Sequence, residues 1–134
     1  MREDMVRECT IVVADDHEAT RSILGDLLRR DGWTVLEARD GVELLELASA
    51  NHPDALVADL GMPRMGGLRA ARALRASPGC ADEVMIAITG QQLVGSREAA
   101  VDRVFDSVLL KPVHPQELRD ALRRGDESAR SLPL

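Results

Sequence analysis

The residues that could carry chemistry stand where short apolar runs end. Two neighbouring acids follow the run TIVVA, and an acid, a hydroxyl and an ammonium end three further runs: Asp15, Asp16, Asp59, Thr89 and Lys111. Carboxylates held within a few ångströms repel each other unless a cation or a proton lies among them. Mg²⁺ suits such a cluster, because it takes one or two carboxylates and keeps several waters. The lysine and the threonine would then form a clamp for the oxygens of a phosphoryl group.

An aspartate held beside a cation and a lysine can itself attack phosphorus and form an aspartyl phosphate. Asp59 is the candidate nucleophile, because it stands alone at the end of its run. Asp15 and Asp16 form a pair that is better suited to holding the metal ion. A single strand-end aspartate is more often a turn or cap residue, so the prediction depends on all five positions lying together.

The elements that must position these residues follow from the hydrophobic pattern. Five apolar segments with little polar alternation are predicted to be strands buried on both faces: 10–14, 33–38, 54–59, 84–89 and 106–111. The stretches between them have helical periodicity. We expect helices over 18–30, after a cap at Asp40, over 67–76, after a cap at Ser96, and from Pro115 onward.

Strands and helices alternate five times, which predicts an α/β fold, a (βα)5 doubly wound five-stranded parallel sheet with helices on both faces. Such sheets bind ligands at the carboxyl ends of the strands, where the strand order reverses. The candidate residues all stand at those ends, so we expect them to converge. We expect one domain over 8–124, between an N-terminal lead-in over 1–7 and a C-terminal tail over 125–134.

Composition excludes several classes of protein. The 134-residue chain is 45% hydrophobic and 30% charged, as globular proteins are. Its formal net charge of −6 argues against non-specific binding to nucleic acid or to an anionic membrane. The charged N-terminus lacks the apolar region of a signal peptide, and no apolar run approaches the ~20 residues of a membrane helix. Cys9 and Cys80 have no metal-ligand spacing, so we expect two reduced thiols. Together these features lead us to expect a soluble, cytoplasmic protein.

Four motifs in this order resemble the receiver domain of two-component response regulators, which has a flavodoxin-like, CheY-like fold. They are DD at 15–16, D-x-x-M-P at 59–63, T-G at 89–90 and K-P at 111–112, and the likeness covers residues 8–124. The resemblance implies that Asp59 accepts a phosphoryl group from a histidine kinase or a histidine phosphotransfer protein. Asp16 would bind Mg²⁺ directly and Asp15 partly through water, with Asp59 and the carbonyl of Gly61 as further ligands. Thr89 and Lys111 would contact phosphoryl oxygens.

The resemblance has further consequences for the backbone and for signal output. It implies a cis Lys111–Pro112 bond and a loop shaped by the unusual backbone angles of Gly66 and Gly67. Receivers often carry an aromatic residue three positions before the lysine, and here that position is Val108. The chain has no tyrosine, and Phe105 is three positions too early to replace it. The usual coupling of threonine to an aromatic ring is therefore not expected in this chain.

The expected function is a phosphorylation-controlled switch that catalyses its own phosphorylation and dephosphorylation without being a conventional enzyme. We expect no output domain after residue 124. We therefore expect output by protein–protein contact to an unknown target, from a monomer or a weak dimer, without nucleic acid binding or membrane insertion. One alternative is the excised C-terminal receiver of a hybrid histidine kinase, although a native Met1 favours a stand-alone protein. A second is a degenerate receiver that acts as a binding module, which would be expected to lose Asp59 or Lys111. A third alternative is a haloacid-dehalogenase-type phosphatase. Such enzymes need a second acid two residues after the nucleophile, and here that position is Gly61, which argues against this alternative.

Overall fold

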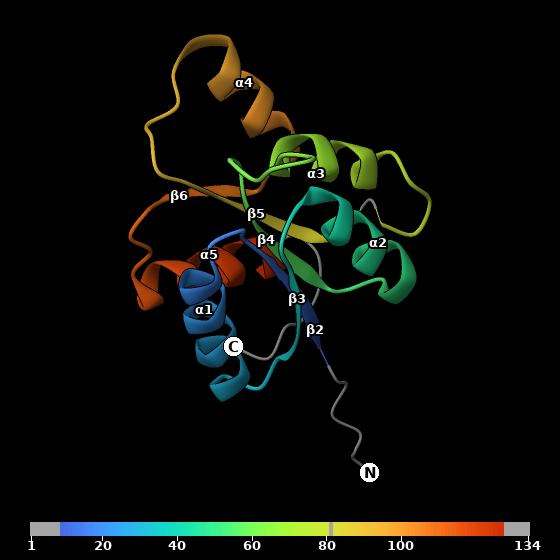
Figure 1. The fold of residues 1–134 in the computed structure, drawn as a ribbon, viewed down its shortest axis with the longest axis vertical. Coiled ribbons are helices and arrows are strands. Elements are labelled where there is room, and N and C mark those ends of the chain that lie inside the picture. Colours follow the sequence, from blue (N-terminus) through green and yellow to red (C-terminus); the bar gives the residue numbers. More distant parts are fainter. Residues whose placement is uncertain (1–8, 81, 128–134) are drawn as a thin grey trace.

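Five strands of the computed structural model form one parallel sheet in the order β3-β2-β4-β5-β6 (Figure 1). The structure describes residues 9–80 and 82–127. The strands are β2 (Thr10–Ala14), β3 (Thr34–Ala38), β4 (Ala55–Asp59), β5 (Val84–Thr89) and β6 (Ser107–Leu110). The sheet confirms the predicted doubly wound α/β fold. Strand order reverses between β2 and β4, so their carboxyl ends flank the crevice in which such folds bind ligands.

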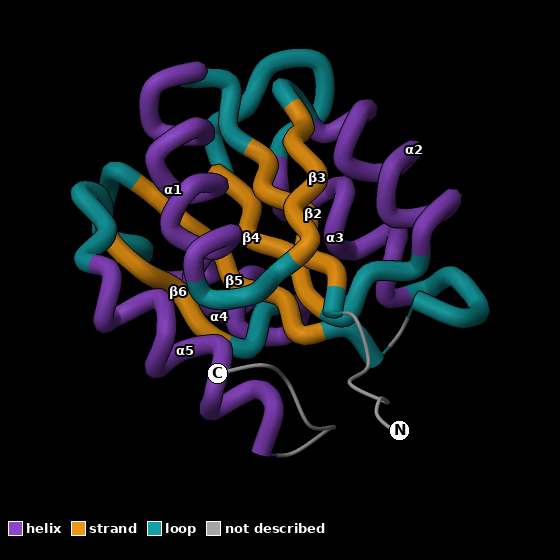
Figure 2. Tube along the Cα trace, turned by 90° about the horizontal axis from the view of Figure 1, so that it is seen from below, coloured by secondary structure: helices purple, strands orange, loops and turns teal. Residues whose placement is uncertain are grey.

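Helices cover both faces of the sheet. α1 (Glu18–Arg30) and α5 (Pro115–Glu127) lie on one face, and α2 (Gly41–Asn51), α3 (Gly67–Arg75) and α4 (Gly95–Val104) lie on the other (Figure 1, Figure 2). Successive strand residues point to opposite faces. In β2, Ile11 and Val13 therefore join the core under α1 and α5, whereas Val12 joins the core under the other three helices. No helix in the described ranges is long and apolar enough to cross a membrane.

Two predicted helix caps have different outcomes. Asp40 caps α2 as expected, because its Oδ1 accepts the N–H of Glu43 at 2.9 Å. The cap predicted at Ser96 is wrong. α4 begins at Gly95, one residue before Ser96, and the residue that precedes the helix is Val94, which has no side-chain acceptor. α4 also buries few side chains, chiefly Val101 and Val104, so it is loosely attached to the rest of the fold.

Part of the C-terminal tail expected over 125–134 is helical, whereas the domain bounds of 8–124 stay a prediction. α5 continues to Glu127, so the first three residues of the expected tail are helical. The reason is close packing. Gly125 is buried with its backbone directly against the side chain of Val84 on β5, where any larger residue would clash. The lead-in over 1–7 and residues 128–134 lie outside the described residues.

Candidate phosphoryl and metal site

Three carboxylates meet at the carboxyl edge of the sheet. Asp15, Asp16 and Asp59 each offer an oxygen, and these oxygens lie within 4.8 Å of one another. The sheet register explains the meeting, because Ala14 on β2 pairs with Ala58 on β4 and the aspartates follow at the same level. Asp15 and Asp59 are buried, whereas Asp16 is exposed to solvent. The predicted convergence of these three residues is therefore present in the structure.

Lys111 reaches into this cluster from the end of β6. Its Nζ lies 2.9 Å from Oδ2 of Asp59 and 3.2 Å from Oδ2 of Asp15. Its backbone N–H donates to the carbonyl of Thr89 at 2.9 Å, which fixes the start of the side chain beside β5. Burial lowers the pKa of the lysine, but the hydrogen bonds to the two carboxylates outweigh it, so the pKa of Lys111 is raised. The predicted cis Lys111–Pro112 bond is confirmed.

Asp15 is held by contacts on three sides. Its N–H donates to the carbonyl of Ala38 at 3.1 Å, and its Oδ1 accepts the N–H of His17 at 2.9 Å. Its Oδ2 is buried and has the ion pair with Lys111 but no hydrogen bond in the described part of the chain. Burial raises the pKa of Asp15, and the nearby charge of Asp59 raises it further, against the lowering effects of the His17 N–H and Lys111.

Arg21 is a part of the site that the sequence pattern does not reveal. Its Nη1 donates to the backbone carbonyl of Asp15 at 2.9 Å, and its Nε donates to Oε1 of Glu37 at 3.1 Å. In a helix over 18–30 the arginines lie opposite the apolar stripe, which favours exposure to solvent, yet the Arg21 side chain is only 11% exposed. Glu37 also accepts from Arg29 at 3.0 Å. A long-range pair between α1 and β3 leaves no signal in a single sequence.

The loop after Asp59 differs from the expected one. Oδ1 of Asp59 accepts the N–H of Gly61 at 3.0 Å. The unusual backbone angle expected at Gly66 or Gly67 falls instead on Arg64, which has a φ of 62°. Gly67 is needed for a different reason, because its backbone packs so closely against the carbonyl of Asp59 that a side chain would overlap it.

Arg64 fastens this loop to α2. Its Nε donates to Oδ2 of Asp40 at 2.9 Å and its Nη2 to Oδ1 at 3.2 Å. Beside this pair, the N–H of Gly41 donates to the carbonyl of Met65 at 2.9 Å. The hydrogen bonds from Arg64 and from the N–H of Glu43 lower the pKa of Asp40. The sequence pattern predicts Asp40 as a cap, but it gives no indication of this second partner.

Thr89 stands at the end of β5, as predicted, but its hydroxyl does not contact the acids. It donates to the carbonyl of Gln91 at 3.1 Å and accepts the N–H of Gln91 at 3.2 Å. Within residues 9–80 and 82–127, no hydrogen bond joins Thr89 to Asp59. In this state both hydrogen bonds of the Thr89 hydroxyl are therefore made within the turn that ends at Gln91.

The donor set suits Mg²⁺. It consists of hard oxygen ligands on two buried acids and one exposed acid, with solvent access through Asp16. The buried Oδ2 of Asp15, which lacks a hydrogen bond within the described residues, is a natural ligand atom. Lys111 already lies between Asp15 and Asp59, which shows that the cluster accepts a positive charge. The role predicted for the Gly61 carbonyl stays a prediction.

Comparisons with known proteins match the chain to one family. The family described as the response regulator receiver domain matches residues 11–123. Response regulator MprA of Mycobacterium ulcerans is 39% identical over 132 residues, which cover 92% of this chain and 56% of that protein. MprA of Mycobacterium tuberculosis strain H37Rv is 39% identical over 131 residues, with the same two coverages. The chain therefore spans about half the length of these relatives.

Solved structures share the fold. A putative response regulator from Chloroflexus aurantiacus superposes with a TM-score of 0.81 at 27% identity, covering 89% of this chain and 98% of that one. The receiver domain of sensor histidine kinase PA1611 from Pseudomonas aeruginosa, solved with a magnesium ion coordinated in its active site cleft, has a TM-score of 0.79 at 27% identity. That match covers 88% of this chain and 97% of the kinase receiver.

Proposed function

The chain belongs to the response regulator receiver domain family of two-component signalling, and we propose that its Asp59 accepts a phosphoryl group with the help of Mg²⁺. The observation that carries the proposal is the contact between Lys111 and Asp59, at 2.9 Å, beside the carboxylates of Asp15 and Asp16. A nucleophilic carboxylate, a cation to hold phosphoryl oxygens and further acids for a metal ion are the parts that acyl phosphate formation needs.

Each residue has a proposed role. An oxygen of Asp59 attacks phosphorus. Lys111 moves from its ion pair with Asp59 to an oxygen of the transferred group. The hydroxyl of Thr89, which now donates to Gln91, exchanges that carbonyl for a phosphoryl oxygen and so reports phosphorylation to the segment after β5.

Asp15, Asp16, Asp59 and the carbonyl of Gly61 are the proposed metal ligands. When bound, Mg²⁺ would neutralise charge on the phosphoryl oxygens and on the carboxylates. The chain supports this role by holding the backbone and side chain of Asp15 with hydrogen bonds to Ala38, His17 and Arg21. The exposed position of Asp16 leaves room for water ligands.

The proposed donor is the phosphohistidine of a histidine kinase or a phosphotransfer protein. A bond forms between the Asp59 carboxylate and phosphorus while the bond from phosphorus to the imidazole nitrogen breaks, and the released imidazole takes a proton from solvent. In dephosphorylation, water attacks phosphorus and regenerates the carboxylate as inorganic phosphate leaves. Both steps occur on the chain's own residue, so the domain is a self-acting phosphoacceptor.

Output by protein–protein contact is proposed for the receiver itself. The MprA relatives extend beyond the matched region, so a further segment could equally carry the output in a longer protein. Similarity to the receiver of a sensor histidine kinase keeps the hybrid-kinase receiver as a second candidate. Retention of both Asp59 and Lys111 in contact disfavours a degenerate binding module.

Intact mass spectrometry after incubation with Mg²⁺ and acetyl phosphate tests the proposal. We expect the mass gain of a single phosphoryl group, which is removed by hydroxylamine and absent when EDTA replaces Mg²⁺. Asp59→Asn should abolish the gain. Asp26→Asn, which changes an exposed aspartate on α1, is the matched control and should retain it. An unchanged gain in Asp59→Asn would reject the proposed acceptor.

A further inference from the structure

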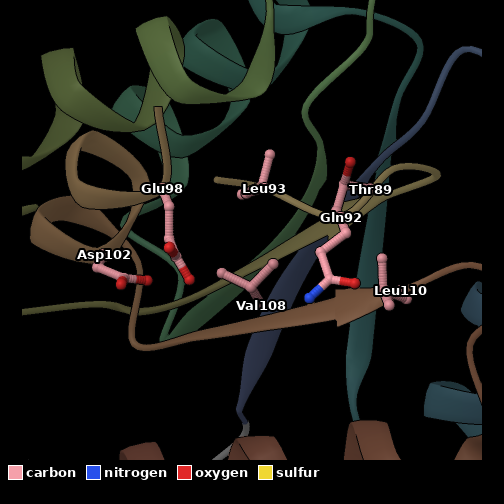
Figure 3. A pocket seen from close by; sticks show the side chains of 7 residues that line it. All are labelled: Thr89, Gln92, Leu93, Glu98, Asp102, Val108 and Leu110. Carbon is pink, nitrogen blue, oxygen red and sulfur yellow. The ribbon is translucent and has the colours of Figure 1, made fainter. Parts of the chain in front are cut away.

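A surface pocket separates α4 from β6 beside Thr89. It has a volume of about 160 Å³ and an apolar floor made by Leu93, Val108 and Leu110. Thr89, Gln92 and, on α4, Glu98 and Asp102 complete its lining. Figure 3 shows these two acids on one side of Val108, with Leu110 on its other side. Leu110 is 50% exposed, so apolar surface at the pocket faces solvent.

The pocket has the size of one aromatic ring. A protein cavity of roughly 150 Å³ with apolar walls holds benzene, and this pocket is slightly larger. Its depth depends on the short side chain of Val108, because a ring at that position would occupy the space itself. The floor of aliphatic side chains supplies the dispersion contacts that a ring requires.

The chain has no ring of its own to place there. Trp33 and Phe105 are its only aromatic residues apart from histidine, and both are buried, at 3% and 5% exposure. Phe105 packs in the core under α2, α3 and α4 and does not line the pocket. The same inventory excludes a second copy as the source of a phenyl, phenol or indole ring, and the net charge of −6 opposes self-association as well.

Two acids at the pocket favour a ligand that carries a positive charge. Glu98 and Asp102 are one helical turn apart on α4 and both are exposed. In the described part of the chain neither carboxylate forms an ion pair. Two unpaired carboxylates beside an apolar floor favour a ligand that places a cation next to its ring.

We propose that this pocket receives a single aromatic side chain of a different protein, presented next to an arginine or lysine. The partner ring would occupy the space above Val108, and the neighbouring cation would lie against Glu98 and Asp102. Because Thr89 also lines the pocket, the occupant would sit beside a residue of the phosphoryl site. Binding itself does not require phosphorylation, so the inference stands or falls separately from the acceptor role of Asp59.

An NMR titration of the unphosphorylated chain tests the proposal with acetyl-Phe-Arg-amide as the probe. We expect saturable amide shifts centred on Leu93, Val108 and Leu110, with a dissociation constant on the order of 1 mM. Acetyl-Ala-Arg-amide, which lacks the ring, and acetyl-Phe-Glu-amide, which reverses the charge, should each bind about tenfold more weakly. Equal shifts from the three probes, shifts centred elsewhere, or no shifts at about 10 mM probe would overturn the proposal.

Two variants with matched controls locate the binding. Val108→Phe fills the pocket and should abolish the shifts, whereas Ile23→Phe adds a ring at an exposed residue of α1 and should not. The double variant Glu98→Gln/Asp102→Asn should weaken binding of acetyl-Phe-Arg-amide about three- to tenfold, and Glu46→Gln on α2 should not. The double variant changes exposed side chains only, so it remains informative if Val108→Phe does not fold. Unchanged binding in the double variant would overturn the charge assignment and with it the proposal.

Discussion

Lys111 Nζ lies 2.9 Å from a carboxylate oxygen of Asp59, the residue we propose as phosphoryl acceptor. The same ammonium lies 3.2 Å from Asp15, so one cation is shared by two buried acids. The cluster therefore carries more negative than positive charge before any ligand binds. This excess is unfavourable for the fold and favourable for binding a divalent cation.

Removing the shared cation should destabilise the protein. Lys111→Met leaves Asp15 and Asp59 without their ion pairs, so we expect the free energy of unfolding at pH 7 without Mg²⁺ to fall by about 1–3 kcal/mol. Mg²⁺ should restore part of the loss. Urea denaturation measures both effects. Arg119→Met is the control, because it removes a cation paired with the single carboxylate of Asp31, and its loss should not respond to Mg²⁺. Wild-type stability in Lys111→Met would contradict the shared-cation interpretation.

Removing the charge of Asp15 should stabilise the protein, whereas removing the charge of Lys111 should destabilise it. The pKa of Asp15 is raised chiefly by burial, so the folded protein binds this proton more tightly than the unfolded chain does. Its contribution to stability therefore falls as pH rises from the unfolded pKa through the folded pKa. We expect Asp15→Asn to raise the free energy of unfolding by about 1 kcal/mol at pH 7, with the gain vanishing at acid pH.

Urea denaturation across pH, without Mg²⁺, checks this expectation for Asp15. Asp16→Asn, at the exposed neighbour, should change the free energy of unfolding by less than about 0.5 kcal/mol. Added Mg²⁺ should stabilise the wild type more than Asp15→Asn, because a ligand stabilises the state that binds it. A loss of stability in Asp15→Asn at neutral pH would show that its ion pair with Lys111 outweighs its burial.

Arg21 should act on the metal site through the backbone of Asp15. Arg21→Gln removes the donor to the Asp15 carbonyl, and we expect Mg²⁺ affinity to fall about tenfold, as for other residues that orient metal ligands. Isothermal titration calorimetry measures this. Arg29→Gln is the matched control, because Arg29 also pairs with Glu37 but has no contact with Asp15. Equal losses in the two variants would mean that the effect comes from Glu37 alone.

The pair of Asp40 and Arg64 should give a pH dependence of the other sign. The hydrogen bond from Arg64 is the chief cause of the lowered pKa of Asp40, so the pair contributes stability above the unfolded pKa of an aspartate. That contribution is lost as pH falls through the lower, folded pKa. We expect Arg64→Gln to lower the melting temperature at pH 7. The melting temperatures of Arg64→Gln and the wild type should differ less near pH 3, which is about one pH unit below the usual pKa of an aspartate.

The double variant Asp40→Asn/Arg64→Gln serves as the control for this pair, because asparagine keeps the cap acceptor for Glu43. It should melt like Arg64→Gln alone at neutral pH. A difference between Arg64→Gln and the wild type that is the same at about pH 3 as at about pH 7 would mean that the charge of Asp40 is not involved.

The sequence predicted the parts of the site that belong to strand ends. Unbroken apolar runs identify β2, β4 and β5, and parallel pairing then brings Asp15 and Asp59 to one edge. Contacts between distant elements could not be predicted in this way. Arg21 with Glu37 and Arg64 with Asp40 depend on helix packing and loop conformation, which determine which surface arginine finds an acid. The direction of the Thr89 hydroxyl, which donates to the carbonyl of Gln91, depends on the local conformation of the turn after β5.

The central claim is that Asp59, rather than a neighbouring acid or hydroxyl, carries the phosphoryl group. Borohydride reduction of the phosphorylated chain converts an aspartyl phosphate into homoserine, and tandem mass spectrometry of its peptides locates the product. We predict homoserine at position 59 only, in the presence of Mg²⁺ and acetyl phosphate. Homoserine at position 15 or 16, or a phosphate that resists reduction and remains on Thr89, would contradict the account.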